Sequence, residues 1–454
     1  MTRIQTQALA AATAARAASR TLAHTSTADK NAALRGIAAA LAHSAIAARA
    51  ALLKANRADL RRAQKLLAQK TLTGATLARL HITDAKLDAM AAGVLQVAAL
   101  PDPSGQVTLE SELDDGLTLR RVTCPFGVVA AIIEARPDAV VQLAALMIKS
   151  GNALILKAGA EARDSTRALV ALLRGTLLAS GLPEDAIVAV EGRQAAQALL
   201  ALDDQIALVV PRGGNKLVQY VQSHTNIPVL GHADGVCHVY VDAAADPEQA
   251  LAIVLDSKTQ APATCNACET VLVHRQIAPG FLPLLMDRLL SAGVTLHGCA
   301  ATQALAAGRP VAPVEAWHTE YGDLAVALRV VDDLDAAIDH IHRHGSSHTD
   351  AIVTRDAAAA QRFLNEVDSA GVYLNASTRF SDGYRYGFGA EVGISTNKLH
   401  ARGPVGLESL VTYKYQLTGH GHLVGDYASG RRHFRHEGGI AQDVKRSSDE
   451  PENR

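Results

Sequence analysis

Aromatic residues and cysteines are scarce in this chain of 454 residues, and its charges nearly cancel. With aromatics at 4% and a single Trp, it has too few stacking side chains for a general platform for nucleic-acid bases. The 44 Lys and Arg against 45 Asp and Glu give a net charge of -1, which does not support binding to nucleic acid or to an anionic membrane. The five cysteines are an odd, scattered set, unlike the framework of a disulfide-stabilised secreted domain. We therefore expect a cytoplasmic protein that binds neither nucleic acid nor membrane.

Long hydrophobic runs are also missing. The longest apolar region, residues 127–148, is interrupted by Glu134, Arg136 and Asp138, so it falls short of the roughly 18 apolar residues that a membrane span requires. The first 28 residues contain arginines but no acidic side chain, a composition shared by transit peptides. In a chain this rich in alanine, we expect an opening helix there instead.

What the sequence does have is apolar residues, at 48%, enough for a large core and too many for a disordered chain. Residues 27–65 show helical spacing. From residue 127 on, short β-rich apolar runs alternate with helical patterns. Because these runs are almost continuously apolar, they are typical of parallel sheets covered on both faces. The expected strands of a first unit are 127–133, 153–157, 187–190, 206–210 and about 228–230, with helices at 137–149, 163–179 and from about 213.

A second α/β unit begins near residue 233, after a break that contains glycines. Its expected strands are 238–241, 270–274, 324–330, 351–354 and 372–374. Residues 108–122 and 410–417 fit neither unit and are expected to pair as a β-arm that reaches a second subunit. Residues 426–454, with few apolar groups, are expected to be a flexible, solvated tail.

Residues 258–270, KTQAPATCNACET, are the strongest candidate for a catalytic segment. They form a polar loop between a helix and a buried strand. A thiol on such a loop can act as a nucleophile. Two other interpretations stay open at this point. Cys265 and Cys268 could form a redox or zinc pair, although no second ligand pair follows, or both could be small buried core residues.

Two further segments are candidates for binding a phosphate-containing ligand. Gly213 and Gly214 follow a strand and open a helix, where free backbone N–H groups favour an anion; an ordinary turn is the alternative. Neither the dinucleotide fingerprint nor a Walker loop occurs. Lys157 stands at the carboxyl end of a strand, where ligands of open α/β sheets bind, although a lone lysine there is often solvated.

A third candidate segment carries donors for a carboxylate. Arg379, with Ser377 and Thr378 before it, follows the strand 372–374, and a guanidinium can hold a carboxylate through two parallel hydrogen bonds. The glycine-dense, charged stretch 387–403 suggests a functional turn of unassigned role.

Taken together, these segments resemble the γ-glutamyl phosphate reductases, the glutamate-5-semialdehyde dehydrogenases of proline biosynthesis, a branch of the aldehyde dehydrogenase superfamily. The resemblance runs from about residue 27 to about residue 424. The matching motifs are EARP (134–137), VPRGG (210–214), CHVYVD (237–242), KTQ through CNACET (258–270), NASTR (375–379) and FGAEVGIS through HARG (388–403).

The resemblance implies that Cys265 is the nucleophile and that Cys268 is not. It also implies an NADP-binding domain formed by 1–107, 124–232 and 375–402, a catalytic domain formed by 233–374, and an oligomerisation arm formed by 108–123 and 403–425. Lys157 would contact the adenosine ribose and Glu320 the nicotinamide ribose, while Arg212, Gly213 and Gly214 would lie at the pyrophosphate turn. The branch prefers NADPH, whose 2′-phosphate Lys157 would suit, whereas Glu161 nearby leaves NAD open.

The implied reaction is reduction of L-glutamyl 5-phosphate through a thioester on Cys265. For the substrate, the expected residues are Arg379 with Ser377 and Thr378 at the α-carboxylate, and Arg136 at phosphate or carboxylate. No metal is expected. The chain is expected to form a homodimer or homotetramer, with glutamate 5-kinase as a possible source of the substrate.

Two departures from the wider superfamily bear on the reaction. Oxidising members carry a Glu-Leu-Gly-Gly segment whose Glu activates water, but here the stretch 230–235 reads LGHADG, with His232 and Asp234 as the only conceivable substitutes. The superfamily's oxyanion Asn is also missing, so the Cys265 backbone N–H is the default donor. The rival functions are an oxidising semialdehyde dehydrogenase and a catalytically silent relative.

Overall fold

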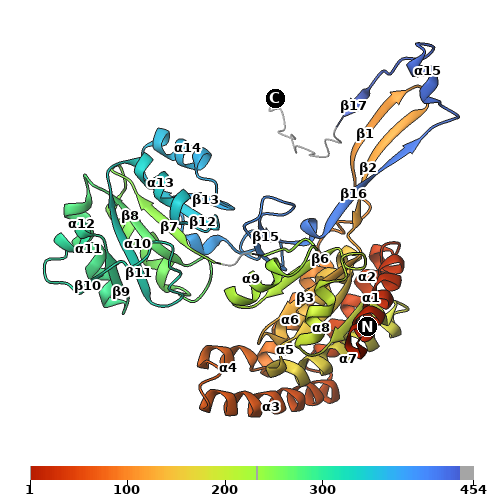
Figure 1. Ribbon diagram of the computed structural model, residues 1–454, viewed down its shortest axis with the longest axis horizontal. Coiled ribbons are helices and arrows are strands. Elements are labelled where there is room, and N and C mark those ends of the chain that lie inside the picture. The colour runs from red at the N-terminus through yellow and green to blue at the C-terminus, as the bar shows by residue number, and fades with distance from the viewer. Residues whose placement is uncertain (1, 232–233, 440–454) are drawn as a thin grey trace, which may run out of the picture.

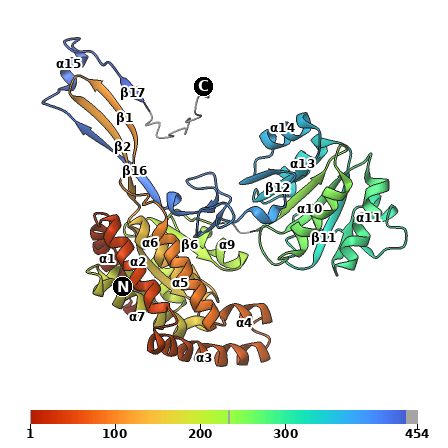
Figure 2. The same cartoon turned by 180° about the vertical axis from the view of Figure 1, so that it is seen from behind.

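The computed structural model describes residues 2–231 and 234–439. It contains two α/β units joined side by side and a long β-arm that projects from the first unit (Figure 1). The same arrangement is seen from behind in Figure 2. Among the described residues no single helix has the length and apolar character to cross a membrane. Only α2 (Thr27–Leu41) and α3 (Ile46–Ala68) taken together meet that test, with a bend of 71° between them.

The first unit is built on a four-stranded parallel sheet in the order β5-β4-β3-β6. Its central strand β3 is buried along its whole length, and alternate side chains enter two different cores on the two faces of the sheet. The sheet is thus covered on both sides, as the apolar runs predicted. The strands are β3 (Val128–Ile133), β4 (Ala153–Ala158), β5 (Ile187–Val190) and β6 (Leu208–Arg212).

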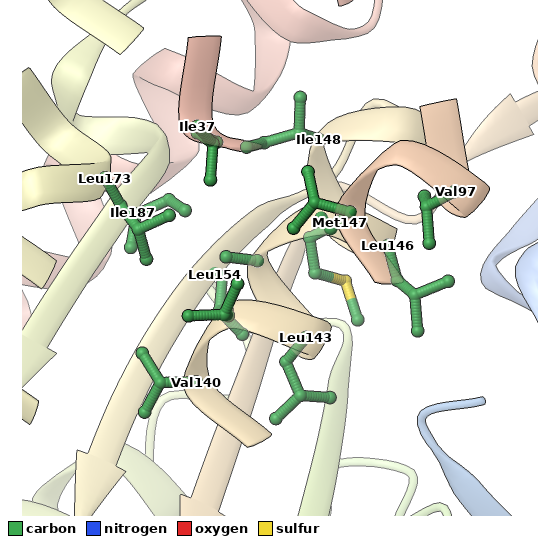
Figure 3. Packing of buried hydrophobic residues seen from close by; sticks show 14 of the residues in the cluster. Ile37, Val97, Val140, Leu143, Leu146, Met147, Ile148, Leu154, Leu173 and Ile187 are labelled. Carbon is green, nitrogen blue, oxygen red and sulfur yellow. The ribbon is translucent and has the colours of Figure 1, made fainter. Parts of the chain in front are cut away.

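Helices from two parts of the chain cover this sheet. On one face, α6 packs with α2, α5 and α7, and Figure 3 shows Val140, Leu143 and Met147 of α6 among this cluster. On the other face, the alanines of α1 allow this helix to lie close to the sheet together with α8 and α9. The expected opening helix is confirmed. The helices are α1 (Arg3–Leu22), α2 (Thr27–Leu41), α3 (Ile46–Ala68), α4 (Gly74–Leu80), α5 (Asp84–Ala99), α6 (Pro137–Ser150), α7 (Arg163–Ala179), α8 (Arg193–Leu200) and α9 (Asn215–Ser223).

The second unit is a seven-stranded parallel sheet in the order β10-β9-β11-β8-β7-β12-β13. The strands are β7 (Cys237–Val241), β8 (Cys268–His274), β9 (Thr295–Gly298), β10 (Val311–Pro313), β11 (Ala325–Val331), β12 (Thr349–Val353) and β13 (Gly371–Leu374). The helices are α10 (Pro247–Thr259), α11 (Ala278–Ser291), α12 (Ala300–Ala304), α13 (Leu334–His344) and α14 (Ala357–Glu366). Separate cores fill its two faces. The doubly wound, parallel α/β class is therefore confirmed for both units.

Four expectations about elements need correction. The strands β9 and β10, at one end of the second sheet, were not expected, and the strand expected near 228–230 is reduced to one bridge between Val209 and Val229. Residues 378–380 contact α10, β7 and β12, so the chain returns to the first unit only after this turn, not at residue 375. The two-stranded sheet β14 (Gly393–Ser395) and β15 (Gly403–Val405) follows it. Residues 424–428 and 437–439 of the expected tail form helix and strand, while 440–454 lie outside the described residues.

The arm is a four-stranded antiparallel sheet in the order β16-β2-β1-β17. Its strands are β1 (Val107–Asp114), β2 (Leu117–Pro125), β16 (Val411–Thr418) and β17 (Glu437–Gly439), with α15 (Val424–Ala428) at its end. The two β segments that fitted neither unit thus pair with each other across nearly 300 residues of sequence, as β2 and β16. Strand β16 is an edge strand, and Tyr413, Tyr415 and Leu417 on it are exposed.

Candidate active site

A cavity of about 420 Å³ lies between the carboxyl edge of the first sheet and the loop that precedes β8. Figures 1 and 2 both place α9, whose N-terminus lines this cavity, on the side of the first unit that faces the second. The sequence-predicted residues that line it are Arg136, Arg212, Gly213, Gly214, Cys265, Glu320 and Arg379. Residues from five separate stretches of sequence are thus gathered in one place.

Cys265 is half-buried in the loop between α10 and β8. Hydrogen bonds fix the loop around it: the Cys237 thiol donates to the Cys265 carbonyl oxygen at 3.2 Å, and the Asn266 side chain donates to the Ser381 carbonyl at 2.8 Å. Cys268 points elsewhere. It is fully buried, its thiol donates to the Thr270 carbonyl, and burial raises its pKa to about 12. The structure therefore separates the two cysteines into a cavity thiol and a core residue.

Gly235 touches the backbone of Cys265. A Cβ at this glycine would stand 2.2 Å from the Cys265 carbonyl oxygen and 2.5 Å from its Cα, distances that no real Cβ adopts. The start of β7 and the cysteine loop therefore fit together only because residue 235 has no side chain.

Guanidinium groups dominate the charge of the cavity. Burial and the neighbouring Arg136 both lower the pKa of Arg212, and the same two causes lower the pKa of Arg79. Arg79, from α4, also lines the cavity, although no pattern in the sequence pointed to it. Glu391 lines the cavity too and opposes the shift at Arg212. Three arginines close enough to repel one another are suited to a multiply charged anion.

Arg379 also lines this cavity and is held by two side chains of the cysteine loop. Its Nε donates to Gln260 Oε1 at 2.9 Å and its Nη1 to Thr264 Oγ1 at 2.7 Å. Burial, then the nearby Arg385, lowers the pKa of Arg379, while the charge of Cys265 opposes this shift.

Ser377 and Thr378 do not line the cavity. Their side chains are buried, where Ser377 Oγ accepts a hydrogen bond from Ser257 and Thr378 Oγ1 donates to the Asn266 carbonyl at 2.7 Å. They hold the turn that carries Arg379 against the cysteine loop. The structure thus gives them a scaffolding place instead of the expected place at a ligand.

Glu320 connects the two α/β units. Its Oε2 accepts a hydrogen bond from Asn215 Nδ2, at the first position of α9, at 3.0 Å. Asn215 also donates to Asp234, a residue that does not line the cavity. His232 lies outside the described residues. Asp234, the one conceivable substitute for the missing water-activating carboxylate among the described residues, is therefore hydrogen-bonded to Asn215 and is not part of the wall around Cys265.

The two glycines of the β6–α9 turn differ in their surroundings. A Cβ at Gly213 would collide with Glu134 and Leu217, whereas Gly214 faces open space. The amide of Gly214 donates to Glu134 Oε2 at 3.1 Å. This amide, at the N-terminus of a helix, is thus already oriented toward an anionic group.

Lys157 lies apart from these residues, in a second cavity of about 420 Å³ at the ends of β4 and β5. Arg163, Arg167 and Arg193 also line this cavity, and Glu191 there is paired with Arg167 through hydrogen bonds, one of them 2.6 Å long. Glu161 is not part of its wall; its Oε1 accepts a hydrogen bond from the Ala135 amide at 2.8 Å. A wall with four cations and one paired carboxylate fits a phosphate-bearing nucleotide.

Both cavities lie at the carboxyl edge of the sheet β5-β4-β3-β6, the edge at which open α/β sheets bind nucleotides. Among residues 2–231 and 234–439, no group of three or more His, Cys, Asp or Glu side chains could hold a metal ion.

Comparisons with known proteins agree with this architecture. The model of the aldehyde dehydrogenase family matches residues 3–297. A gamma-glutamyl phosphate reductase of Synechococcus sp. (strain WH7803) is 56% identical over 387 residues, which cover 85% of this chain and 88% of that protein. The reductase of Pelotomaculum thermopropionicum is 49% identical over 92% of this chain and 94% of its own length.

Solved structures give the same answer. The crystal structure of gamma-glutamyl phosphate reductase from Thermotoga maritima is 38% identical to this chain, covers 92% of it and 99% of its own length, and superposes with a TM-score of 0.87. The expected fold and enzyme class are confirmed: the chain is an oxidoreductase, a glutamate-5-semialdehyde dehydrogenase of proline biosynthesis. This chain belongs to the aldehyde dehydrogenase family, within its gamma-glutamyl phosphate reductase branch.

Proposed function

We propose that the chain reduces L-glutamyl 5-phosphate to L-glutamate 5-semialdehyde and phosphate with NADPH, through a thioester on Cys265. The observation that carries the proposal is the single cavity in which the Cys265 thiol stands among Arg136, Arg212 and Arg379. A substrate with a carboxylate at one end and an acyl phosphate at the other matches a cavity that holds a nucleophile together with several cations.

The two ends of the substrate can be assigned to different arginines. Arg379, fixed by the cysteine loop, is assigned to the α-carboxylate. Arg79 and Arg136 are assigned to the phosphate, because burial and the nearby charge of Arg136 lower the pKa of Arg79. Arg212 interacts with Arg136, Glu391 and Cys265, so we assign it to the substrate side of the cavity as well as to the cofactor turn. Ser377 and Thr378 position Arg379.

The chemistry of the chain's own residues then follows in two stages. The Cys265 thiolate attacks the γ-acyl carbon, and the C–O bond to phosphate breaks, with its electron pair leaving on the phosphate. Arg79 and Arg136 stabilise that departing charge, and the Cys265 backbone N–H is the default donor to the oxyanion. Lys157, the Gly213–Gly214 turn and Glu320 would hold NADPH, which would supply the hydride that reduces the thioester. The Cys265 thiolate is finally expelled as the aldehyde forms.

The surroundings of Cys265 support reduction over oxidation with water. Hydrolysis of the thioester needs a general base within hydrogen-bond reach of a water molecule at the acyl carbon. Asp234 instead accepts a hydrogen bond from Asn215 and is absent from the cavity wall. With phosphate as the leaving group, no such base is required.

The reverse assay tests this function. Purified protein is given glutamate 5-semialdehyde and NADP⁺ with and without inorganic phosphate, and NADPH is followed by its absorbance. We expect turnover to fall at least about tenfold without phosphate, because the thioester then has no efficient acceptor. Arsenate serves as the control, since it can replace phosphate as the acceptor. Phosphate-independent formation of glutamate would instead support the oxidising rival.

A second prediction concerns the cofactor. Lys157→Met removes one of the cations around the second cavity. We therefore expect KM for NADPH to rise about tenfold while KM for NADH changes little. The size of the effect follows because one charged hydrogen bond contributes about 1.5–3 kcal/mol. Initial rates with both cofactors measure this. Lys54→Met, an exposed change on α3, is the matched control. An equal rise for both cofactors would move Lys157 away from the 2′-phosphate.

We further propose that the arm mediates assembly into a dimer or tetramer. Its edge strand β16 is unpaired on one side among the described residues and exposes Tyr413, Tyr415 and Leu417, an apolar surface suited to a second copy. A cytoplasmic location is proposed because the nucleophile must remain a free thiol, and all five cysteines are free. Supply of the unstable acyl phosphate by glutamate 5-kinase is part of the same proposal.

A further inference from the structure

A buried ion pair closes the base of the cysteine loop. Lys258 Nζ, in the last turn of α10, lies 2.9 Å from Glu269 Oε2, at the start of β8, and both side chains are fully buried. Cys265 lies between the two in sequence. The pair therefore fixes the separation of the two ends of the loop that carries the nucleophile.

The same carboxylate also holds the loop that carries Glu320. Glu269 Oε2 accepts a hydrogen bond from the Tyr321 amide at 3.2 Å, and Oε1 accepts one from the Gly322 amide at 3.4 Å. These amides directly follow Glu320, which lines the cavity and accepts a hydrogen bond from Asn215. One carboxylate thus connects the loop of the thiol and the loop of the residue assigned to the nicotinamide ribose.

Stability alone does not account for this pair. Burying two charges costs several kcal/mol per ion in real proteins, and replacing such a pair with apolar residues is often neutral or stabilising. What an apolar pair would not supply is a directional acceptor for the two amides after Glu320. Buried polar groups of this kind are retained where they specify one arrangement.

Resting on the proposed function, we propose that Glu269 is a positioning residue. Paired with Lys258, it keeps the Cys265 loop and the Glu320 loop in one fixed relation, so that the thioester and the cofactor meet in reactive geometry. Its charge is what holds both loops. Protonation would weaken the contact with Lys258 and with both amides, and loosen the arrangement without unfolding the chain.

Glu269 gains or loses its proton within the pH range of ordinary assays. Burial raises the pKa of Glu269 from 4.5 to about 7, against the opposing effects of Lys258 and the two amides. The other titratable groups that interact with it are Cys268 on β8 and Tyr321 on its loop. Burial raises the pKa of both, so both stay neutral here. His297 stacks on the Tyr321 ring and not on Glu269.

Activity and stability should therefore change in opposite directions with pH. Because the folded chain takes up this proton near pH 7 and the unfolded chain near 4.5, the group's stabilising contribution is full below 4.5 and lost as the pH rises through 7. Acidification from pH 8 to 6 thus neutralises Glu269, on whose charge the positioning depends. The same protonation of Glu269 increases the free energy of unfolding.

The test is the pH dependence of kcat for wild type and Glu269→Gln, measured in the reduction direction or in the phosphate-dependent reverse assay. Gln is uncharged at every pH, so we expect kcat about tenfold below wild type at pH 8, as misplacement of reacting groups by a fraction of an ångström does. The ratio between the two proteins should shrink toward one at pH 6. A purely structural role would give a ratio that does not change with pH.

Two variants complete the experiment. Lys258→Met with Glu269→Gln removes both charges at similar volume, and should fold and show the same converging ratio even if the single variant is unstable. Glu366→Gln, which breaks the exposed pair with Arg362, should match wild type throughout. A wild-type kcat for the double variant at pH 8, or a constant ratio, overturns the positioning role. Wild-type protein without phosphate-dependent turnover would instead overturn the proposed function.

Discussion

Cys265→Ala is expected to lower kcat by about 10⁴-fold or more, because removal of a covalent nucleophile leaves only binding and oxyanion stabilisation. The substitution deletes one atom from a half-buried side chain, so the fold and cofactor binding should persist. Without the sulfur, neither loss of phosphate nor formation of the thioester can occur. Steady-state reduction, with NADP⁺ binding measured separately by fluorescence, gives both quantities.

The matched control is Cys268→Ala. Its thiol is buried and donates to the Thr270 carbonyl, so we expect a loss of about 1 kcal/mol of stability from the small cavity and no loss of turnover at 25 °C. Mass spectrometry of wild type quenched with substrate but without NADPH should show an acyl adduct on the peptide with Cys265. An adduct on another cysteine, or an active Cys265→Ala protein, would reassign the nucleophile.

The parallel sheets could be predicted from the sequence because their strands are buried on both faces. Strand β3 is six apolar residues in a row, and α6 begins with Pro137 and is followed by Gly151 in a left-handed conformation. The strands that were missed lie at one end of the second sheet, where β10 is the edge strand and β9 is its neighbour. β9 alternates in exposure and β10 is three residues long with a terminal proline, so neither has a pattern that differs from a loop.

The cavity itself could be predicted only in part. Cys265 and the Gly213–Gly214 turn belong to motifs, and Glu320 was expected from the family resemblance; these residues do line it. Arg79 comes from the seven-residue helix α4, in a region for which nothing was predicted from the sequence. Nothing local distinguishes a surface arginine from one that reaches a cavity formed by distant segments.

Ser377 and Thr378 are the opposite case, because they were expected at the ligand but do not line the cavity. Polar side chains beside an arginine suggested a set of donors for one ligand. The same serine and threonine hydroxyls can instead donate to buried carbonyls, and the sequence of the segment is identical in the two cases. Thr378 donates to the Asn266 carbonyl, a contact between residues more than a hundred positions apart. Which partner a polar side chain has is decided by tertiary packing.

Close backbone approach is another feature that composition hides, and Gly235→Ala is the prediction that exposes it. The added methyl would overlap the Cys265 carbonyl oxygen and Cα, at 2.2 and 2.5 Å. Both are backbone atoms, so no side-chain rotation relieves the contact and the cysteine loop must move. We expect kcat to fall by about 10²-fold, as a displacement of about 1 Å at a nucleophile does, with a loss of about 1–3 kcal/mol of stability from the overpacking.

The measurement separates these two effects. Gly280→Ala, in α11 with nothing within 4 Å of the added Cβ, should keep full activity and serves as the matched control for a glycine substitution. If Gly235→Ala is folded at the assay temperature, the fall in kcat should appear together with slower alkylation of Cys265 by iodoacetamide, because both depend on where the sulfur lies. A folded variant with wild-type kcat would show that the loop tolerates the shift, and that the contact between β7 and Cys265 does not set the position of the nucleophile.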